Sequence, residues 1–149
     1  MIFYLDASAL VKRYIDEVGT RQVNQLFAEP AAIGTSLITH AEVTAALSKA
    51  IRMSLLPREE AYVALRVFRV QWPSLMRLQV TEGAVSQAGT LAWEHGLRGF
   101  DAIHLATAFL WQESAQAPVT FATFDRHLWR AAQAAGLEVW PKDLESAML

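Results

Sequence analysis

Short apolar segments alternate with longer helix-like segments along the whole chain, and this alternation constrains the fold more than any other feature. Five apolar segments have the length and composition of strands, at 2–5, 32–35, 75–80, 119–122 and 137–140. The first is a continuous apolar run, which is typical of a strand buried on both faces of a sheet. Because helical segments separate all five, the sequence predicts parallel strands joined by right-handed crossovers. We therefore expect an α/β fold in which helices flank a central, mostly parallel sheet.

Residues that start or stop helices mark the segments between the strands. Helices are expected near 7–14, 20–28, 39–53, 57–72, 81–95, 101–112 and 125–135. Ser36 and Thr39 are candidate N-caps of the third helix, and Gly136 is suited to the end of the last one. An insertion at about 38–73 contains two helices, which we expect to protrude as a pair. No repeat or linker divides the chain, so residues 1–149 are expected to form one domain.

Composition limits the classes of function that the chain can have. The absence of Cys excludes a disulfide scaffold, a thiolate zinc site and a cysteine nucleophile. A net charge of −2 argues against binding nucleic acid through bulk positive charge, so any such contact must be local. No apolar run reaches the ~20 residues of a membrane span, and no basic segment precedes the apolar start, so we expect a cytoplasmic protein without a targeting segment. A mean hydropathy of +0.19 indicates a dense core and a buried subunit interface.

Four carboxylates occupy positions that the predicted topology brings together. Asp6 follows the first strand and Asp125 follows the fourth. Glu42 lies in the first turn of the helix after the second strand, and Asp101 begins the helix that runs back toward the fourth. In open parallel sheets, ligands bind beyond the carboxyl ends of the strands. We therefore expect all four side chains to line one cleft at this edge of the sheet.

These carboxylates also have a purely structural interpretation. Asp is a favoured N-cap, and Thr39 and Glu42 have the spacing of a capping box. Their convergence favours chemistry instead, because two unit charges about 4 Å apart repel by about 4 kcal/mol at an effective dielectric near 20. Protonation or a cation must relieve such repulsion. Oxygen ligands alone favour Mg²⁺ or Mn²⁺, which points to metal-assisted attack of water on a phosphodiester.

Four segments carry these residues in a characteristic order. They are Phe3-Tyr-Leu-Asp6-Ala-Ser8-Ala-Leu, Thr39-His-Ala-Glu42-Val, Leu97-Arg-Gly-Phe-Asp101-Ala-Ile-His104-Leu-Ala-Thr-Ala, and Thr123-Phe-Asp125-Arg-His-Leu followed by Ala134-Ala-Gly136-Leu. In order and spacing the sequence resembles the PIN-domain ribonucleases, and in particular the VapC toxins of toxin–antitoxin pairs. The resemblance covers the chain end to end, and no acidic position is missing.

The resemblance implies a fold, an activity and partners. The fold would be a PIN-like three-layer domain, and the activity a metal-dependent endoribonuclease that leaves a 5′-phosphate and a 3′-hydroxyl. The implied ligands of Mg²⁺ or Mn²⁺ are Asp6, Glu42, Asp101 and Asp125. Ser8 and Thr123 match the hydroxyl positions that orient those carboxylates. The protein would be a homodimer, inhibited by a cognate antitoxin that binds a groove formed by the helical insertion.

Other polar residues near the motifs are candidates for contact with RNA. Those that could bind phosphates flanking the cut are Lys12, Arg13, Arg98 and Arg126, although each is equally explained as a solvated or ion-paired side chain. Tyr14 and Phe100 could stack a base, but core packing is the commoner fate of such aromatics. His104 lies one turn after Asp101, and we interpret it as a packed, hydrogen-bonded histidine rather than a metal ligand.

Two alternatives remain open from the sequence. The first is another nuclease role on the same fold, such as RNA processing or DNA cleavage, which a narrow preference for one RNA without growth arrest would favour. The second is a phosphatase-like or non-catalytic α/β domain. Against the second, the chain has neither of the common glycine-rich phosphate-binding motifs, and Asp6 is followed by Ala-Ser-Ala rather than by a second acid two places on.

Overall fold

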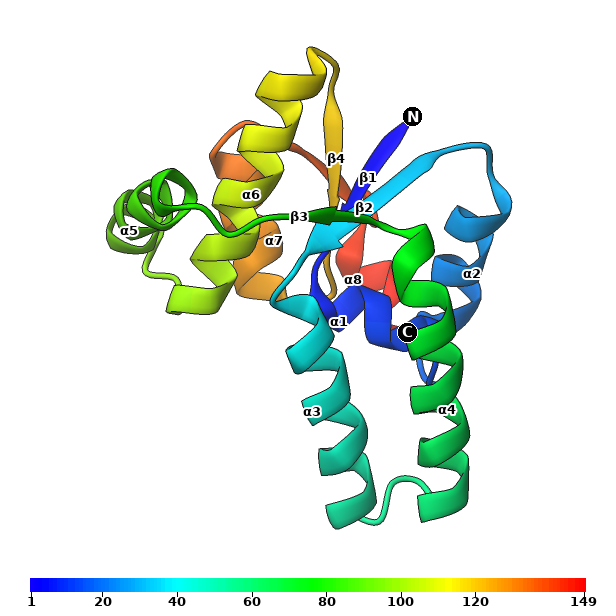
Figure 1. Cartoon of the computed structure of the whole chain (residues 1–149). Coiled ribbons are helices and arrows are strands. Elements are labelled where there is room, and N and C mark those ends of the chain that lie inside the picture. Colours follow the sequence, from blue (N-terminus) through cyan, green and yellow to red (C-terminus); the bar gives the residue numbers. More distant parts are fainter.

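The computed structural model describes residues 1–149 and contains one five-stranded sheet (Figure 1). The strands are β1 (Ile2–Leu5), β2 (Ala32–Ser36), β3 (Met76–Leu78), β4 (Val119–Ala122) and β5 (Glu138–Trp140). Their order is β3-β2-β1-β4-β5, and every neighbouring pair is parallel. The predicted fold class is thereby confirmed. The third strand is shorter than predicted, because β2 ends at Ser36 and offers no partner beyond Leu78.

Helices occupy the connections between the strands. The α-helices are α1 (Ala7–Leu10), α2 (Thr20–Ala28), α3 (Thr39–Arg52), α4 (Arg58–Gln71), α5 (Glu82–His95), α6 (Gly99–Ala115), α7 (Arg126–Ala134) and α8 (Leu144–Ala147), and two 3-10 turns are η1 (Val11–Arg13) and η2 (Trp72–Ser74). The sequence did not predict α8, a single turn that Asp143 caps. No helix combines the length and the apolar character that a membrane crossing requires.

The start of α3 corrects one prediction from the sequence. Ile38 is the N-cap residue, rather than Ser36 or Thr39, and it makes no side-chain capping bond. The Thr39 hydroxyl is instead 2.6 Å from the hydroxyl of Thr35, which itself donates to the carbonyl oxygen of Leu5. These buried bonds tie the first turn of α3 to the ends of β1 and β2. They therefore set the position of Glu42 relative to the sheet, because Glu42 lies one turn further along α3.

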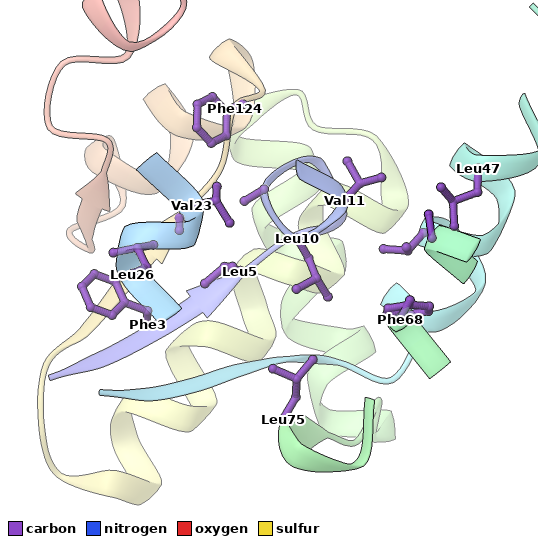
Figure 2. Packing of buried hydrophobic residues seen from close by; sticks show 14 of the residues in the cluster. Phe3, Leu5, Leu10, Val11, Val23, Leu26, Leu47, Phe68, Leu75 and Phe124 are labelled. Carbon is purple, nitrogen blue, oxygen red and sulfur yellow. The ribbon is translucent and has the colours of Figure 1, made fainter. Parts of the chain in front are cut away.

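Alternating side chains of β1 separate two halves of the core. Phe3 and Leu5 belong to a cluster with α1, α2, α3 and α4, whose packing is shown in Figure 2. Tyr4 points to the opposite face and belongs to a second cluster with α5, α6 and α7. The molecule is therefore a three-layer α/β/α sandwich, because a strand presents successive side chains to opposite faces.

Gly34 in β2 shows how closely the second layer approaches the sheet. A Cβ atom at this position would lie 2.6 Å from the indole ring of Trp111 on α6. Glycine in the interior of a strand commonly marks such a close approach. The fit lets Trp111 cover β2 while remaining only 7% exposed.

Helices α3 and α4 form the helical pair, which projects away from the sheet (Figure 1). Phe68 of α4 belongs to the core cluster and is fully buried among the rings of Tyr14, His40 and Trp72.

The strand order places a ligand site beside β1. From β1 the chain crosses to β2 and then β3, and it later returns to the other side of β1 as β4. This reversal is the topological switch point at which open α/β sheets bind ligands. The Asp6 amide donates to the carbonyl oxygen of Ala122, which brings the ends of β1 and β4 together at this edge.

Candidate active site

Asp6 lies at the centre of the candidate site. It is the N-cap of α1, where Oδ1 accepts hydrogen bonds from the Ala9 amide at 3.0 Å and the Ser8 hydroxyl at 2.7 Å. The Thr123 hydroxyl donates to Oδ2 at 2.7 Å. Burial raises the pKa of Asp6, although His104, Thr123, Ser8 and the Ala9 amide oppose the shift. A desolvated carboxylate of this kind is well suited to bind a cation.

Ser8 and Thr123 connect Asp6 to the next acidic segment. The Ser8 oxygen accepts from the Phe124 amide at 3.0 Å, and the Thr123 oxygen accepts from the Asp125 amide at 3.1 Å. Each hydroxyl therefore donates to Asp6 and accepts from the backbone that carries Asp125. This arrangement holds both oxygens of Asp6 in a fixed orientation, as the hydrogen-bond partners of metal ligands do.

Glu42 reaches the site from α3. Its side chain is 28% exposed, and Oε1 lies 2.6 Å from Nε2 of His104 on α6. The capping-box interpretation of Glu42 is therefore wrong, since its side chain contacts another helix rather than the start of its own. The other carboxylate oxygen of Glu42, Oε2, has no hydrogen-bond partner in the protein.

Asp101 and Asp125 share the guanidinium of Arg98. The Nε atom of Arg98 is 2.8 Å from Oδ2 of Asp101, and its Nη2 atom is 3.3 Å from Oδ2 of Asp125. The hydrogen bond and charge of Asp101, and then the charges of Asp125 and Glu42, raise the pKa of Arg98. Asp125 also caps α7 through Oδ1, which accepts from the Leu128 amide, whereas Asp101 lies inside α6 and caps nothing.

The donor set fits a divalent cation by its chemistry. Four carboxylates lie around the switch point, and an open cleft of about 440 Å³ is lined in part by Glu42, Arg98 and Asp101. As the side chains stand, no three acidic or histidine groups are close enough to share one ion. The positive charge between Asp101 and Asp125 belongs to Arg98, so a cation is already favoured where these carboxylates face each other. Oxygen-only ligands at such a position are those preferred by Mg²⁺ and Mn²⁺.

The remaining candidates for RNA contact lie in different surroundings. Lys12 is buried, its Nζ atom lies 3.0 Å from Glu17, and it packs over the ring of Phe124. The ion-paired alternative that the sequence left open therefore describes the surroundings of Lys12, and its contact with RNA stays a prediction. Arg13 bonds Asn24, and Arg126 pairs with Glu145 at 3.2 Å.

The two candidate stacking residues also differ from each other. Tyr14 packs edge-on against Phe68 in the core, where burial raises its pKa to about 12. Phe100 is 63% exposed and lines the cleft beside Asp101. Of the two, only Phe100 is exposed at the candidate site.

Comparison with known proteins identifies the family. The sequence profile of the PIN domain matches residues 3–134, and this range includes all four carboxylates. The chain belongs to the PIN domain family. Ribonuclease VapC45 of Mycobacterium tuberculosis is 35% identical over 144 residues, which are 97% of this PIN domain protein and 98% of that one.

Solved structures agree with the fold of this PIN domain. FitAcB from Neisseria gonorrhoeae superposes with a TM-score of 0.66 at 21% identity, covering 95% of this chain and 98% of that chain. A toxin–antitoxin complex from Klebsiella pneumoniae gives a TM-score of 0.57 at 22% identity, covering 80% of this chain and 84% of that chain.

Sequence reasoning missed the contacts that hold this PIN-domain site together. It interpreted His104 as a hydrogen-bonded core residue, which it is, but did not predict that its partner is Glu42. It gave no role to Tyr4, whose hydroxyl bonds the other nitrogen of His104. Asp6 follows Tyr4 by two residues, and only that closeness hinted that Tyr4 could belong to the site.

Proposed function

We propose that this chain is a metal-dependent endoribonuclease and the toxin of a toxin–antitoxin pair, acting in the cytoplasm. The observation that carries the proposal is the placement of four carboxylates around the switch point of the sheet. Asp6 is buried there, Arg98 bridges Asp101 and Asp125, and Glu42 lines the same cleft as Asp101. The near full-length similarity to Ribonuclease VapC45 supports RNA as the substrate. The fold shared with the toxin–antitoxin complex from Klebsiella pneumoniae supports an antitoxin as the partner.

Residues of this chain would hold and orient the reacting groups. Those proposed to hold Mg²⁺ or Mn²⁺, directly or through water, are Asp6, Glu42, Asp101 and Asp125. When bound, such an ion activates water and neutralises charge developing on a phosphate. Ser8 and Thr123 keep Asp6 in one orientation. Because water rather than the ribose 2′-hydroxyl attacks, the products would carry a 5′-phosphate and a 3′-hydroxyl.

The helical pair supplies a surface for the antitoxin. A groove of about 600 Å³ lies between α3 and α4, lined in part by Leu47, Ile51, Tyr62 and Leu65. We propose that an apolar antitoxin segment binds here. We also propose a homodimer, which would cover apolar side chains such as Trp93, now 90% exposed.

Purified protein incubated with RNA tests the proposed function. We expect cleavage with Mg²⁺ or Mn²⁺, no cleavage with EDTA, and new 5′-phosphate ends. Asp6→Asn should lose this cleavage. Its matched control is Asp16→Asn, which should cut like the wild type because Asp16 is exposed and lies outside the site. Cleavage that persists in EDTA would contradict the metal requirement, and failure to cut any RNA would contradict the nuclease.

Removal of Arg98 should strengthen metal binding while weakening RNA binding. The guanidinium competes with a cation for Asp101 and Asp125, and its side chain is 79% exposed. Because exposed ion pairs contribute about 0.2–1 kcal/mol, Arg98→Ala should bind Mn²⁺ about 1.4- to fivefold more tightly at low salt. In the wild type, a bound metal would free the guanidinium of Arg98 to contact an RNA phosphate. Arg98→Ala lacks this contact, so its plot of log RNA affinity against log salt should be less steep by about 1.

Calorimetric titration with Mn²⁺ and salt-dependent RNA binding measure these two effects. Arg126→Ala is the matched control, because Arg126 pairs with Glu145 instead of the site. Its Mn²⁺ affinity should equal that of the wild type. Weaker Mn²⁺ binding by Arg98→Ala would show that Arg98 supports the metal site rather than competing with it.

A further inference from the structure

A buried chain of hydrogen bonds connects β1, α6 and α3 behind the carboxylates. The Tyr4 hydroxyl on β1 is 2.7 Å from Nδ1 of His104, and Nε2 of the same ring is 2.6 Å from Oε1 of Glu42. Tyr4 is fully buried and His104 is 1% exposed. Three elements that are distant in sequence therefore meet through one imidazole ring.

The carboxylate of Glu42 sets the direction of its own bond in this chain, and the state of the ring sets that of the other. An ionised carboxylate only accepts hydrogen bonds, so Nε2 of His104 must donate to Glu42. In the neutral ring Nδ1 is then an acceptor, and the hydroxyl of Tyr4 is the donor beside it. Both ring nitrogens are satisfied, and the orientation of the imidazole is determined from both sides.

The surroundings of Tyr4 make this anchor rigid. Its ring stacks on Phe121 of β4 with 5.4 Å between centroids, and it meets His104 edge-on at 5.8 Å. Tyr4 also precedes Asp6 by two residues on the same segment. Strand β1 therefore positions Asp6 directly and reaches Glu42 through His104.

We propose that His104 is a positioning residue for Glu42: through Tyr4 it holds one carboxylate oxygen so that the other faces the bound cation. This inference rests on the proposed function. Glu42 needs such support because its long side chain is partly exposed and no other bond to its carboxylate is recorded. Loss of a partner that orients a ligand commonly weakens metal binding or activity 10- to 100-fold.

A set of variants separates positioning from packing. His104→Leu removes the donor, His104→Gln offers an amide N–H in its place, and Tyr4→Phe removes only the anchor. Phe121→Leu is the packing control, because the Phe121 ring touches Tyr4 but takes no part in the hydrogen bonds that join Tyr4, His104 and Glu42. All are tested as the full chain, and thermal melting confirms that each is folded before Mn²⁺ affinity and RNA cleavage are measured.

The expected order of effects follows from the bonds removed. His104→Leu should bind Mn²⁺ about 10- to 100-fold more weakly, with a smaller loss in Tyr4→Phe and a substantial recovery in His104→Gln. Phe121→Leu should lower the melting temperature while changing Mn²⁺ affinity less than Tyr4→Phe does, because the hydrogen bonds through His104 remain. In a Glu42→Gln background, His104→Leu should have little further effect, because the two residues act as one unit. Nitrogen NMR of the wild type should find the proton of His104 on Nε2.

Several results would overturn the proposal. If His104→Leu binds Mn²⁺ like the wild type, or weakens Mn²⁺ binding equally with and without Glu42, His104 does not position that carboxylate. An active wild type in that case leaves the nuclease proposal intact. If the wild type neither binds Mn²⁺ nor cuts RNA, the proposed function fails and this inference fails with it.

Discussion

An Asp6→Asn protein is expected to lose RNA cleavage by about a thousandfold or more while remaining folded. A bound metal contributes several kcal/mol to transition-state stabilisation, and each 1.36 kcal/mol corresponds to a factor of ten in rate. Asparagine has nearly the shape of aspartate and can still accept from Ser8 and the Ala9 amide. It lacks the negative charge that a cation requires. Single-turnover cleavage in Mn²⁺ measures the loss.

In the absence of metal, Asp6→Asn should affect stability in the opposite direction to activity, since it should stabilise the protein relative to the wild type as pH rises. Burial raises the pKa of Asp6, so the folded state holds its proton more tightly than the unfolded state does. This contribution to stability is present at low pH and is lost as pH rises from the ordinary Asp range through the raised pKa. Asparagine does not titrate. The melting temperature of Asp6→Asn minus that of the wild type should therefore increase from about pH 4 to pH 7.

The same melts contain their own controls. Asp16→Asn alters an exposed carboxylate outside the site and is measured at the same pH values as the control. Added Mn²⁺ should raise the melting temperature of the wild type and of Asp16→Asn but not that of Asp6→Asn. A difference for Asp6→Asn that shrinks as pH rises would show that its hydrogen bonds outweigh burial and lower the pKa.

The sequence was sufficient to locate the edge of the sheet at which the carboxylates gather. Asp6 and Asp125 follow strands whose apolar runs are visible in the sequence, and parallel topology places strand ends together. Ser8 and Thr123 were predictable as their neighbours because each lies two positions from an Asp. Such inferences need only local periodicity and one rule about topology.

Contacts between distant segments could not be read in this way. His104 and Glu42 are separated by 62 positions, and nothing in the local pattern of either predicts the other as its partner. The true start of α3 depends on Thr35 and Thr39 meeting in the folded state. The two interpretations of Lys12 stayed open for the same reason, since its partner ring on Phe124 follows β4. In each case, tertiary packing decides between interpretations that are equally good locally.

Phe68→Ala is expected to have the largest effect on stability of any single truncation in the helical pair, about 3–5 kcal/mol. The side chain is fully buried, and its ring lies 5.2 Å from Tyr14, 5.2 Å from His40 and 5.5 Å from Trp72, measured between centroids. Figure 2 shows Phe68 at the junction of the helical pair with the rest of the core. Truncation removes apolar contacts from α4 and from α3 at once. Urea unfolding measures the change in free energy.

Phe68→Ala should also weaken metal binding at the candidate site, because its neighbour His40 lies on α3 two positions before Glu42. Loss of the ring at Phe68 loosens the packing that holds this turn, so Mn²⁺ affinity should fall even at urea-free conditions where the variant is fully folded. Phe100→Ala is the matched control for stability: the same residue type is 63% exposed there, and its free energy of unfolding should change by no more than about 0.5 kcal/mol. A Phe68→Ala protein with wild-type Mn²⁺ affinity would show that the bonds of Thr39 to Thr35 and of Glu42 to His104 hold α3 without the helical pair.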